Sequence, residues 1–166
     1  MHRVSKLALA VALAGALAFA GAAYAQEPQF SLGFQAFADM LPDIVGQPLE
    51  DASYDAIGNA TQPTTTGLLV WNKLDNTVAF TNGTQTWVLA PEGLLLRNND
   101  ERFQFEVLRE GVENQLDAQI DPLIGLLPPD ELQAEIDLLT TQAQSQLEFL
   151  DAQLEQPDAI VIVPVE

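Results

Sequence analysis

The side chains best suited to binding chemistry are aromatic residues that alternate with other residues between Thr66 and Leu96. Within this stretch, segments in which the side-chain character alternates at every second residue are separated by turn residues. This pattern predicts three antiparallel strands of a β-meander. Alternate side chains of a strand point to the same face. One face is therefore expected to carry Leu69, Trp71, Val78, Phe80, Trp87 and Leu89.

This apolar face has two interpretations. A small meander has to pack its apolar face against another element, which predicts that these side chains form the core. Flat, exposed aromatic rings are also suited to stacking on sugar rings, so Trp71, Phe80 and Trp87 are candidate ligand-binding residues.

Asn82-Gly83 lies between two of the expected strands. Asn-Gly is the favoured sequence of a two-residue type I′ turn because both turn residues need a positive φ. Such a turn predicts three cross-strand pairs, which are Thr81 with Thr84, Phe80 with Gln85 and Val78 with Trp87.

The residue types present exclude several kinds of catalytic site. The chain has no cysteine, and its one histidine, His2, lies in a segment expected to be removed. The rest of the chain therefore has no Ser-His-Asp or Cys-His relay and no His- or Cys-ligated zinc site. A Ser-Lys pair would need Lys73 with Ser31, Ser53 or Ser145, and no motif supports it.

Carboxylates are abundant, so a carboxylate-dependent hydrolase such as a small glycosidase is the alternative to a binding function. It needs two acids about 5 to 9.5 Å apart, and Glu50 and Asp75 are the candidates. Glu50, Asp51 and Asp55 could also gather around calcium, but their spacing differs from that of the EF-hand calcium loop, and a solvated loop is the other interpretation. We expect no catalytic residue, no cofactor and no metal site.

The first 25 residues have the features of a secretory signal peptide. His2, Arg3 and Lys6 precede an apolar run from Leu7 to Ala20, and Ala23-Tyr24-Ala25 is a small-x-small cleavage site. Cleavage after Ala25 would release the chain to the periplasm, the cell envelope or the extracellular space. No later stretch is long and apolar enough for a transmembrane anchor, so membrane retention of the uncleaved signal is the alternative.

All 24 acidic residues lie beyond residue 25, whereas two of the six basic residues lie before it, so the exported chain would carry a net charge of −20. This charge repels nucleic acid and anionic lipid. It is compatible with high solubility, with loose cation binding, or with a neutral or basic partner. We therefore exclude nucleic acid as a partner and expect a protein or a glycan.

Helices are expected on both sides of the meander. Phe30, Phe34, Phe37 and Leu41 follow one another at helical spacing, which predicts a short helix that Ser31 caps and that covers the apolar face. After the meander, the sequence predicts a helix from Glu110 to Ile120 and another from Asp130 to about Gln156. The second carries an apolar stripe formed by Leu132, Ile136, Leu139, Ala143, Leu147, Leu150 and Leu154.

That stripe is expected to pack against the preceding helix as a helical hairpin. Its alternative use is to bind a partner helix or a second copy of the chain in a homo-oligomer. The segment Arg102 to Val107 alternates and predicts either a last strand or the entry to the helices. The β-branched run from Ala159 to Val165 predicts a terminal strand that pairs with a sheet edge of its own chain or with another chain.

The expected fold class is α+β: a small antiparallel β-meander with a short N-terminal helix, followed by a C-terminal helical hairpin and a terminal β-strand. The expected divisions are a signal peptide (1–25), a helix plus β-meander module (26–107), a helical segment (108–156) and a terminal strand (157–166).

Five short motifs occur in order, and they are Gly46-x-Pro48-x-Glu50, Gln62-x-Thr64-Thr65-x-Gly67-Leu68-Leu69-Val70-Trp71, Ala79-Phe80-Thr81-x-Gly83-x-x-Thr86-Trp87, Pro91-x-Gly93-Leu94 and Glu101-Arg102-Phe103. Together they resemble a small extracellular bacterial module over about residues 30–105. Such a module is found alone or appended to exported proteins and has no established activity, so the resemblance implies the module boundary and export. The chain departs from the pattern at Ala90, where a glycine usually precedes the proline, and at Asn72, where a basic residue usually follows the tryptophan.

Overall fold

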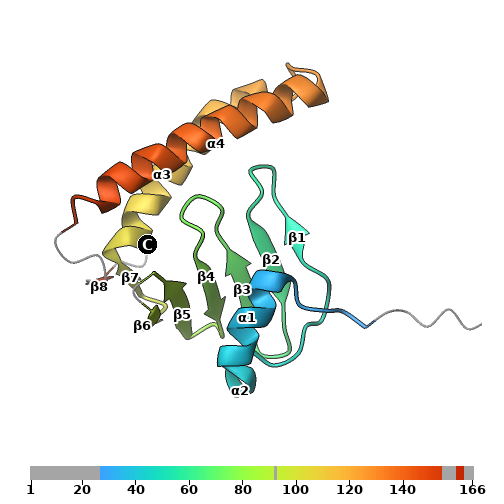
Figure 1. Ribbon diagram of the computed structural model, residues 1–166, viewed down its shortest axis with the longest axis vertical. Helices are drawn as coiled ribbons and strands as arrows, with labels where there is room; N and C mark the ends of the chain where they lie inside the picture. The colour runs from blue at the N-terminus through green and yellow to red at the C-terminus, as the bar shows by residue number, and fades with distance from the viewer. Residues whose placement is uncertain (1–26, 92, 155–159, 163–166) are drawn as a thin grey trace, which may run out of the picture.

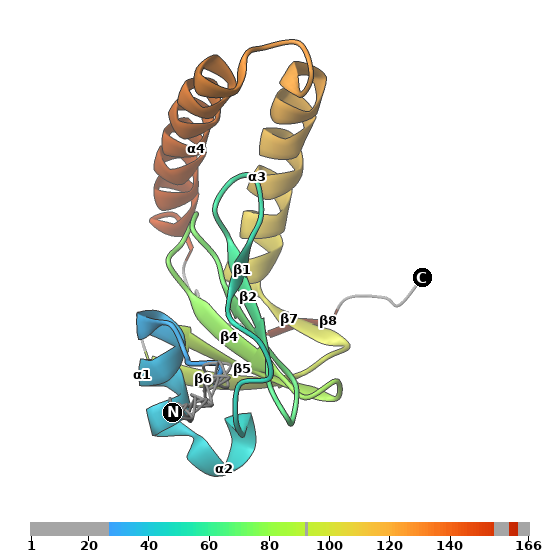
Figure 2. The same ribbon diagram turned by 90° about the vertical axis from the view of Figure 1, so that its right-hand side faces the viewer.

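The computed structural model describes residues 27–91, 93–154 and 160–162. An antiparallel sheet has a short helix on one face and a pair of long helices beyond the ends of its strands (Figures 1 and 2). This architecture confirms the expected α+β class, with its meander, its short N-terminal helix and its C-terminal helices. The expected signal peptide and its cleavage point lie outside the described residues.

Six strands form one meander in which each strand pairs antiparallel with its neighbour in the sequence. The first two strands come from a stretch whose turn residues break any sequence period. Asp55 orders that stretch, because its Oδ1 accepts hydrogen bonds from the backbone N–H groups of Ile57, Gly58 and Asn59 at 3.1, 2.8 and 2.8 Å. The strands are β1 (Ser53–Tyr54), β2 (Ala60–Pro63), β3 (Leu68–Trp71), β4 (Val78–Thr81), β5 (Gln85–Ala90) and β6 (Gly93–Asn98).

The predicted register between β4 and β5 is wrong by two residues. Thr81 lies opposite Thr86, and Phe80 lies opposite Trp87 instead of Gln85. The observed register places the Phe80 and Trp87 rings in contact, with centroids 5.8 Å apart. Because the shift is an even number of residues, every apolar side chain stays on the face that the alternation predicts.

The turn itself is one residue later than Asn82-Gly83. Gly83 and Thr84 are its central residues, and the Asn82 N–H donates to the Gln85 carbonyl at 3.2 Å. Gly83 has a φ of 89°, as the first central residue of a type II′ turn requires. The Asn82 side-chain oxygen accepts hydrogen bonds from the N–H groups of Thr84 and Gln85 at 2.9 and 2.8 Å, which gives Asn82 a role outside the turn centre.

Helix α1 (Leu32–Met40) lies across one face of the sheet and is followed by the short helix α2 (Pro42–Val45), as Figure 2 shows. Phe34 and Phe37 of α1 are fully buried against the sheet. The predicted apolar face is confirmed. Leu69, Val78, Phe80 and Trp87 are buried in this cluster, and Trp71 and Leu89 pack against it half-buried.

Helices α3 (Gln104–Ile120) and α4 (Pro129–Asp151) form the expected helical hairpin, connected through the short helix η1 (Asp121–Leu123). Helix α3 begins at Gln104 and not at Glu110, because the Glu106 carboxylate accepts a hydrogen bond from the Phe103 N–H at 2.8 Å and caps the first turn. Among the described helices, none is long and apolar enough to cross a membrane.

The hairpin is anchored on the loops of the sheet. Ile57 from the β1–β2 loop and Leu74 from the β3–β4 loop are buried in the same cluster as the facing side chains of the two helices. Figure 1 shows these loops reaching the underside of the hairpin. The helix residues in the cluster are Val112, Leu116 and Ile120 of α3, with Ile136, Ala143 and Leu147 of α4.

The terminal strand pairs within its own chain. β8 (Ile160–Ile162) is antiparallel to β7 (Glu101–Phe103), and the two form a separate two-stranded sheet. The segment that begins at Arg102 is therefore both a strand and the entry to a helix, since β7 ends where α3 begins.

Candidate functional site

The three aromatic candidates occupy different environments. Phe80 is completely buried, and Trp87 is 9% exposed, so both belong to the core under α1. Trp71 is half-buried, and its indole N–H donates to the Asn76 side-chain oxygen at 3.0 Å. Of these three side chains, Trp71 lines a hollow in the surface.

A row of side chains across β1, β2 and β3 forms this hollow. Tyr54 pairs with Ala60, and Ala60 pairs with Trp71, so all three point to the same face of the sheet. Ala60, between the two large aromatic residues, is itself 3% exposed and packs in the core cluster under α1. The aromatic hollow has a volume of about 640 Å³ and is lined by Phe30, Ser31, Gly33, Phe34, Tyr54, Ala60, Trp71 and Asn76.

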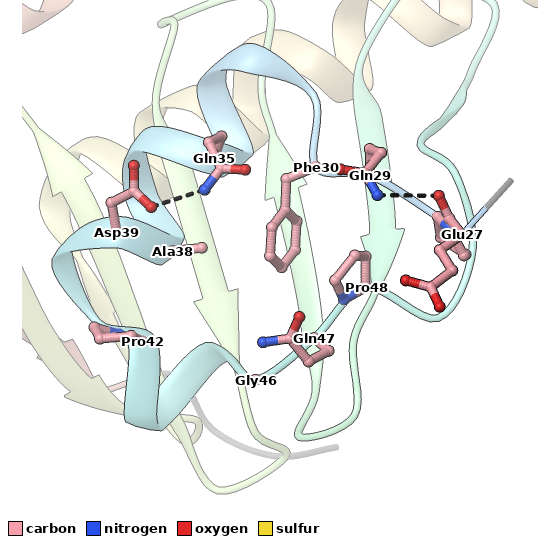
Figure 3. A pocket seen from close by; sticks show the side chains of 11 residues that line it. Glu27, Gln29, Phe30, Gln35, Ala38, Asp39, Pro42, Gly46, Gln47 and Pro48 are labelled. Atoms are coloured by element: carbon pink, nitrogen blue, oxygen red, sulfur yellow. Dashed lines mark hydrogen bonds between the residues drawn. The ribbon is translucent and has the colours of Figure 1, made fainter.

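Phe30 also lines a second hollow, so the two adjoin at this residue. Figure 3 shows the Phe30 ring pointing into the second hollow between α1 and Pro48. Its polar groups are mainly amides and carboxylates, and Gln35 donates to Asp39 at 2.7 Å. This polar hollow has a volume of about 470 Å³ and is lined by Glu27, Pro28, Gln29, Phe30, Gln35, Ala38, Asp39, Pro42, Gly46, Gln47 and Pro48.

A buried glutamine holds the segment that both hollows share. The Gln62 amide donates to the carbonyls of Gln29 and Glu50, each at 2.9 Å, and its side chain is completely buried. These bonds fix the chain just before α1, where Phe30 lies. Gln62 therefore positions the wall between the hollows.

The electrostatics of the two hollows favour a neutral or cationic ligand. Glu27 and Asp39 line the polar hollow, whereas none of the four Lys and Arg residues of the described chain lines either hollow. An anionic ligand would have to approach these carboxylates without a compensating cation.

Of the two carboxylates named for a hydrolase, Asp75 is held by neighbouring side chains. Asp75 accepts a hydrogen bond from Arg109 at 2.7 Å, and Thr77 donates its hydroxyl to the same Asp75 at 2.6 Å. Neither Glu50 nor Asp75 is among the described residues that line the two hollows. No three His, Cys, Asp or Glu side chains of the described residues gather as metal ligands.

The candidate partner-binding stripe lies mostly inside the hairpin. Ile136 and Leu147 are buried against α3, and Leu132, Leu139 and Leu150 pack half-buried around the same cluster. Leu154 instead packs on the far side of the sheet, with Val88 and Phe103. Self-association through this helix remains a prediction.

The alternation of side chains along the strands could not identify Phe30, Tyr54 or Gln62 as site residues. The helical spacing that places Phe30 on one face with Phe34 predicts a core residue, and the two-residue strand that contains Tyr54 is too short to have a period. Gln62 stands inside the motif order described above, which is the signal that could have identified it. No protein-family model, curated protein or solved structure matches the chain.

Proposed function

We propose that the chain is exported and acts as a non-catalytic binding module of the cell envelope or the extracellular space, with a glycan as its ligand in the aromatic hollow. The observation that carries the proposal is the Tyr54–Ala60–Trp71 row, whose two aromatic side chains line one hollow in the surface. The apolar faces of sugar rings stack on such aromatic surfaces. The signal-like N-terminal segment and the resemblance to an extracellular module support export.

The polar hollow determines the direction in which the ligand would extend from the aromatic hollow. Sugar hydroxyls need hydrogen-bond partners, and Gln35 and Gln47 present amides next to Phe30. A few polar groups beside an apolar surface are the usual composition of a small-ligand site. A glycan of more than one sugar residue would stack at Trp71 and extend past Phe30 towards these amides.

The test uses Trp71 as its own reporter. The chain has two tryptophans, so Trp87→Phe leaves Trp71 as the single indole. We expect neutral oligosaccharides of hexose and of N-acetylhexosamine, used as probes, to change its emission in a saturable way. Tyr54→Ala in the same background should weaken binding by about tenfold through loss of one stacking surface.

The matched control is Phe149→Ala, because Phe149 is an aromatic side chain on α4 that is 68% exposed. It should leave the titration unchanged. Equal binding by the Tyr54→Ala protein, or no response to any of the oligosaccharides, would contradict glycan binding at this hollow. Cleavage of the oligosaccharide during the titration would contradict a non-catalytic role.

A protein partner is the second candidate, and the tip of the helical hairpin favours it. Ile124 and Leu126 lie between η1 and α4 and are 55% and 75% exposed. Figure 2 shows the connection between α3 and α4 at the end of the hairpin that lies away from the sheet. Exposed apolar side chains that lie together are characteristic of protein contact sites. Chemical crosslinking to envelope proteins should then be lost with Leu126→Gln and kept with Phe149→Gln.

A further inference from the structure

A third hollow lies on the face of the sheet opposite α1, and its floor is a row of polar side chains. Thr81 pairs with Thr86, and Thr86 pairs with Arg97, so these three residues of β4, β5 and β6 lie side by side on one face. The hollow has a volume of about 300 Å³ and is lined by Val70, Ala79, Thr81, Thr86, Arg97, Asn99, Arg102, Glu106 and Arg109.

The positive charge of the chain is concentrated around this hollow. Arg97, Arg102 and Arg109 are three of the four Lys and Arg residues beyond residue 25, in a chain with 24 acidic residues. The fourth, Lys73, lies elsewhere, with its Nζ 4.0 Å from Asp137. Three positive side chains therefore lie together in a chain that is strongly negative as a whole, and the contacts around them have to account for this.

Two of the three arginines are neutralised by carboxylates. Arg97 donates to both oxygens of Glu106, at 2.6 and 2.9 Å, and the two side chains are 7% and 5% exposed. Arg109 donates to Asp75 at 2.7 Å and also lies 3.9 Å from Glu106. Two arginines and two carboxylates thus form a neutral, mostly buried network.

Arg102 is the cation that this network leaves unmatched. Its Nη1 donates to the carbonyls of Asn99 and Glu101 at 2.9 and 2.8 Å, which fixes the guanidinium without neutralising it. No carboxylate of the described residues lies within 4.0 Å of Arg102. Since a guanidinium has five N–H donors, a fixed and unmatched one is a ready site for a carboxylate.

We propose that this hollow binds a small carboxylic acid, with its carboxylate at Arg102 and a short apolar body over Val70 and Ala79. Asn99 and Thr86 supply a fixed polar wall, because the Thr86 hydroxyl donates to the Asn99 amide oxygen at 2.7 Å. A single unmatched charge beside Glu106 fits an anion of one charge better than a phosphate dianion. The volume lies at the lower end of small-molecule sites, which suits a ligand with a short body.

The test is an NMR titration, at constant ionic strength, of protein recovered from the exported fraction. Butyrate is the probe, butanol has the same body without the charge, and inorganic phosphate is the second anion. We expect butyrate to bind saturably, butanol not to bind, and phosphate to bind more weakly. Arg102→Gln should weaken butyrate binding by about tenfold or more.

Lys73→Gln is the matched control because it removes the same charge outside the hollow. It should change the butyrate affinity by less than about twofold. Equal weakening by both variants would mean a bulk charge effect and would overturn the proposal, as would unchanged binding by Arg102→Gln. If Arg102→Gln does not fold, Ala79→Leu fills the apolar end with every arginine in place. It should weaken butyrate more than formate, and an equal effect on both acids overturns the proposal.

Discussion

At the scale of single residues, one network of ion pairs joins the sheet to the helical hairpin. Arg97 on β6 binds Glu106 in the first turn of α3, and Arg109 of the same helix binds Asp75 in the β3–β4 loop. Glu106 also caps its own helix at the Phe103 N–H. The network therefore sets the position at which α3 leaves the sheet.

Glu106→Gln is expected to destabilise the fold strongly. The substitution keeps the volume of the side chain but leaves Arg97 charged and unpaired in a site where its side chain is 7% exposed. Removing one partner of a buried ion pair costs about 3–5 kcal/mol. Urea unfolding at neutral pH measures the loss, and Glu110→Gln, on an exposed position of the same helix, is the control. A loss for Glu106→Gln as small as that of Glu110→Gln would contradict a structural role for the network.

A second residue-scale prediction concerns pH. Burial raises the pKa of Glu113 above its ordinary value of 4.5. A hydrogen bond from Asn72 and the nearby positive charge of Arg109 lower the pKa, but burial has the larger effect. The native state then binds more protons than the unfolded state between the two pKa values, so this group stabilises the fold less as pH rises through that window. Above the raised pKa, the folded protein has to bury the charged form.

Glu113→Gln should therefore raise the melting temperature at pH values above the folded pKa. Its amide oxygen can still accept the Asn72 hydrogen bond. At a pH well below 4.5, where Glu113 is protonated in both states, the two proteins should melt at the same temperature. Melting curves across this range check the sign, and a variant that is less stable at neutral pH would contradict it.

The ion pairs and the Gln62 contacts could not be predicted from the sequence. Gln62 donates to a carbonyl 33 positions away, and no period or turn motif relates the two residues. The same holds for Ala60, because its small size matters only once Tyr54 and Trp71 lie on either side of it. What the alternation did predict, namely the shared face of Trp71, Phe80 and Trp87, depends on neighbours in the chain alone.

At the scale of elements, the helical hairpin and the sheet share one core through two loops. Ile57 and Leu74 are 7% and 5% exposed where the β1–β2 and β3–β4 loops meet the helices. Gln144 of α4 adds a hydrogen bond to the Lys73 carbonyl at 3.0 Å. The hairpin is thus part of the folded unit that holds β3, and with it Trp71.

Leu74→Ala should weaken this connection. Truncating a buried leucine costs about 2–5 kcal/mol, depending on how far the surroundings relax. Leu49→Ala, at a position 55% exposed, is the control and should cost less than about 0.5 kcal/mol. Chemical denaturation followed by circular dichroism measures both losses. Equal midpoints for the two variants would contradict a shared core.

The elements were more predictable than their pairing. Helical spacing identified α1 and α4, because each has one apolar face that must pack. The β4–β5 register was wrong because Asn-Gly favours one turn type locally, whereas the contact of Phe80 with Trp87 and the hydrogen bonds of Asn82 decide the observed one. The start of α3 was wrong because its cap is a carboxylate inside the helix and not a residue before it.

At the scale of the whole molecule, the two faces of the sheet have opposite electrostatic characters. The hollows beside α1 are lined by aromatic, amide and carboxylate groups, and the hollow on the other face is lined by three arginines. A charge of −20 for the chain beyond residue 25 weakens the binding of anions, and Arg102, which the ion-pair network leaves unmatched, opposes that effect locally. A neutral glycan on one face and a small acid on the other are compatible with this division.

The proposed binding function requires that Trp71 is an accessible wall of the aromatic hollow and that Trp87 belongs to the buried core. Acrylamide quenching of two single-tryptophan proteins tests it directly, because this neutral quencher is not repelled by the negative charge. In Trp71→Phe, the remaining Trp87 should emit at short wavelength and resist quenching. In Trp87→Phe, the remaining Trp71 should be readily quenched and should be protected by the oligosaccharide that binds. A Trp71 that emits at short wavelength and resists quenching as strongly as Trp87 would contradict the account.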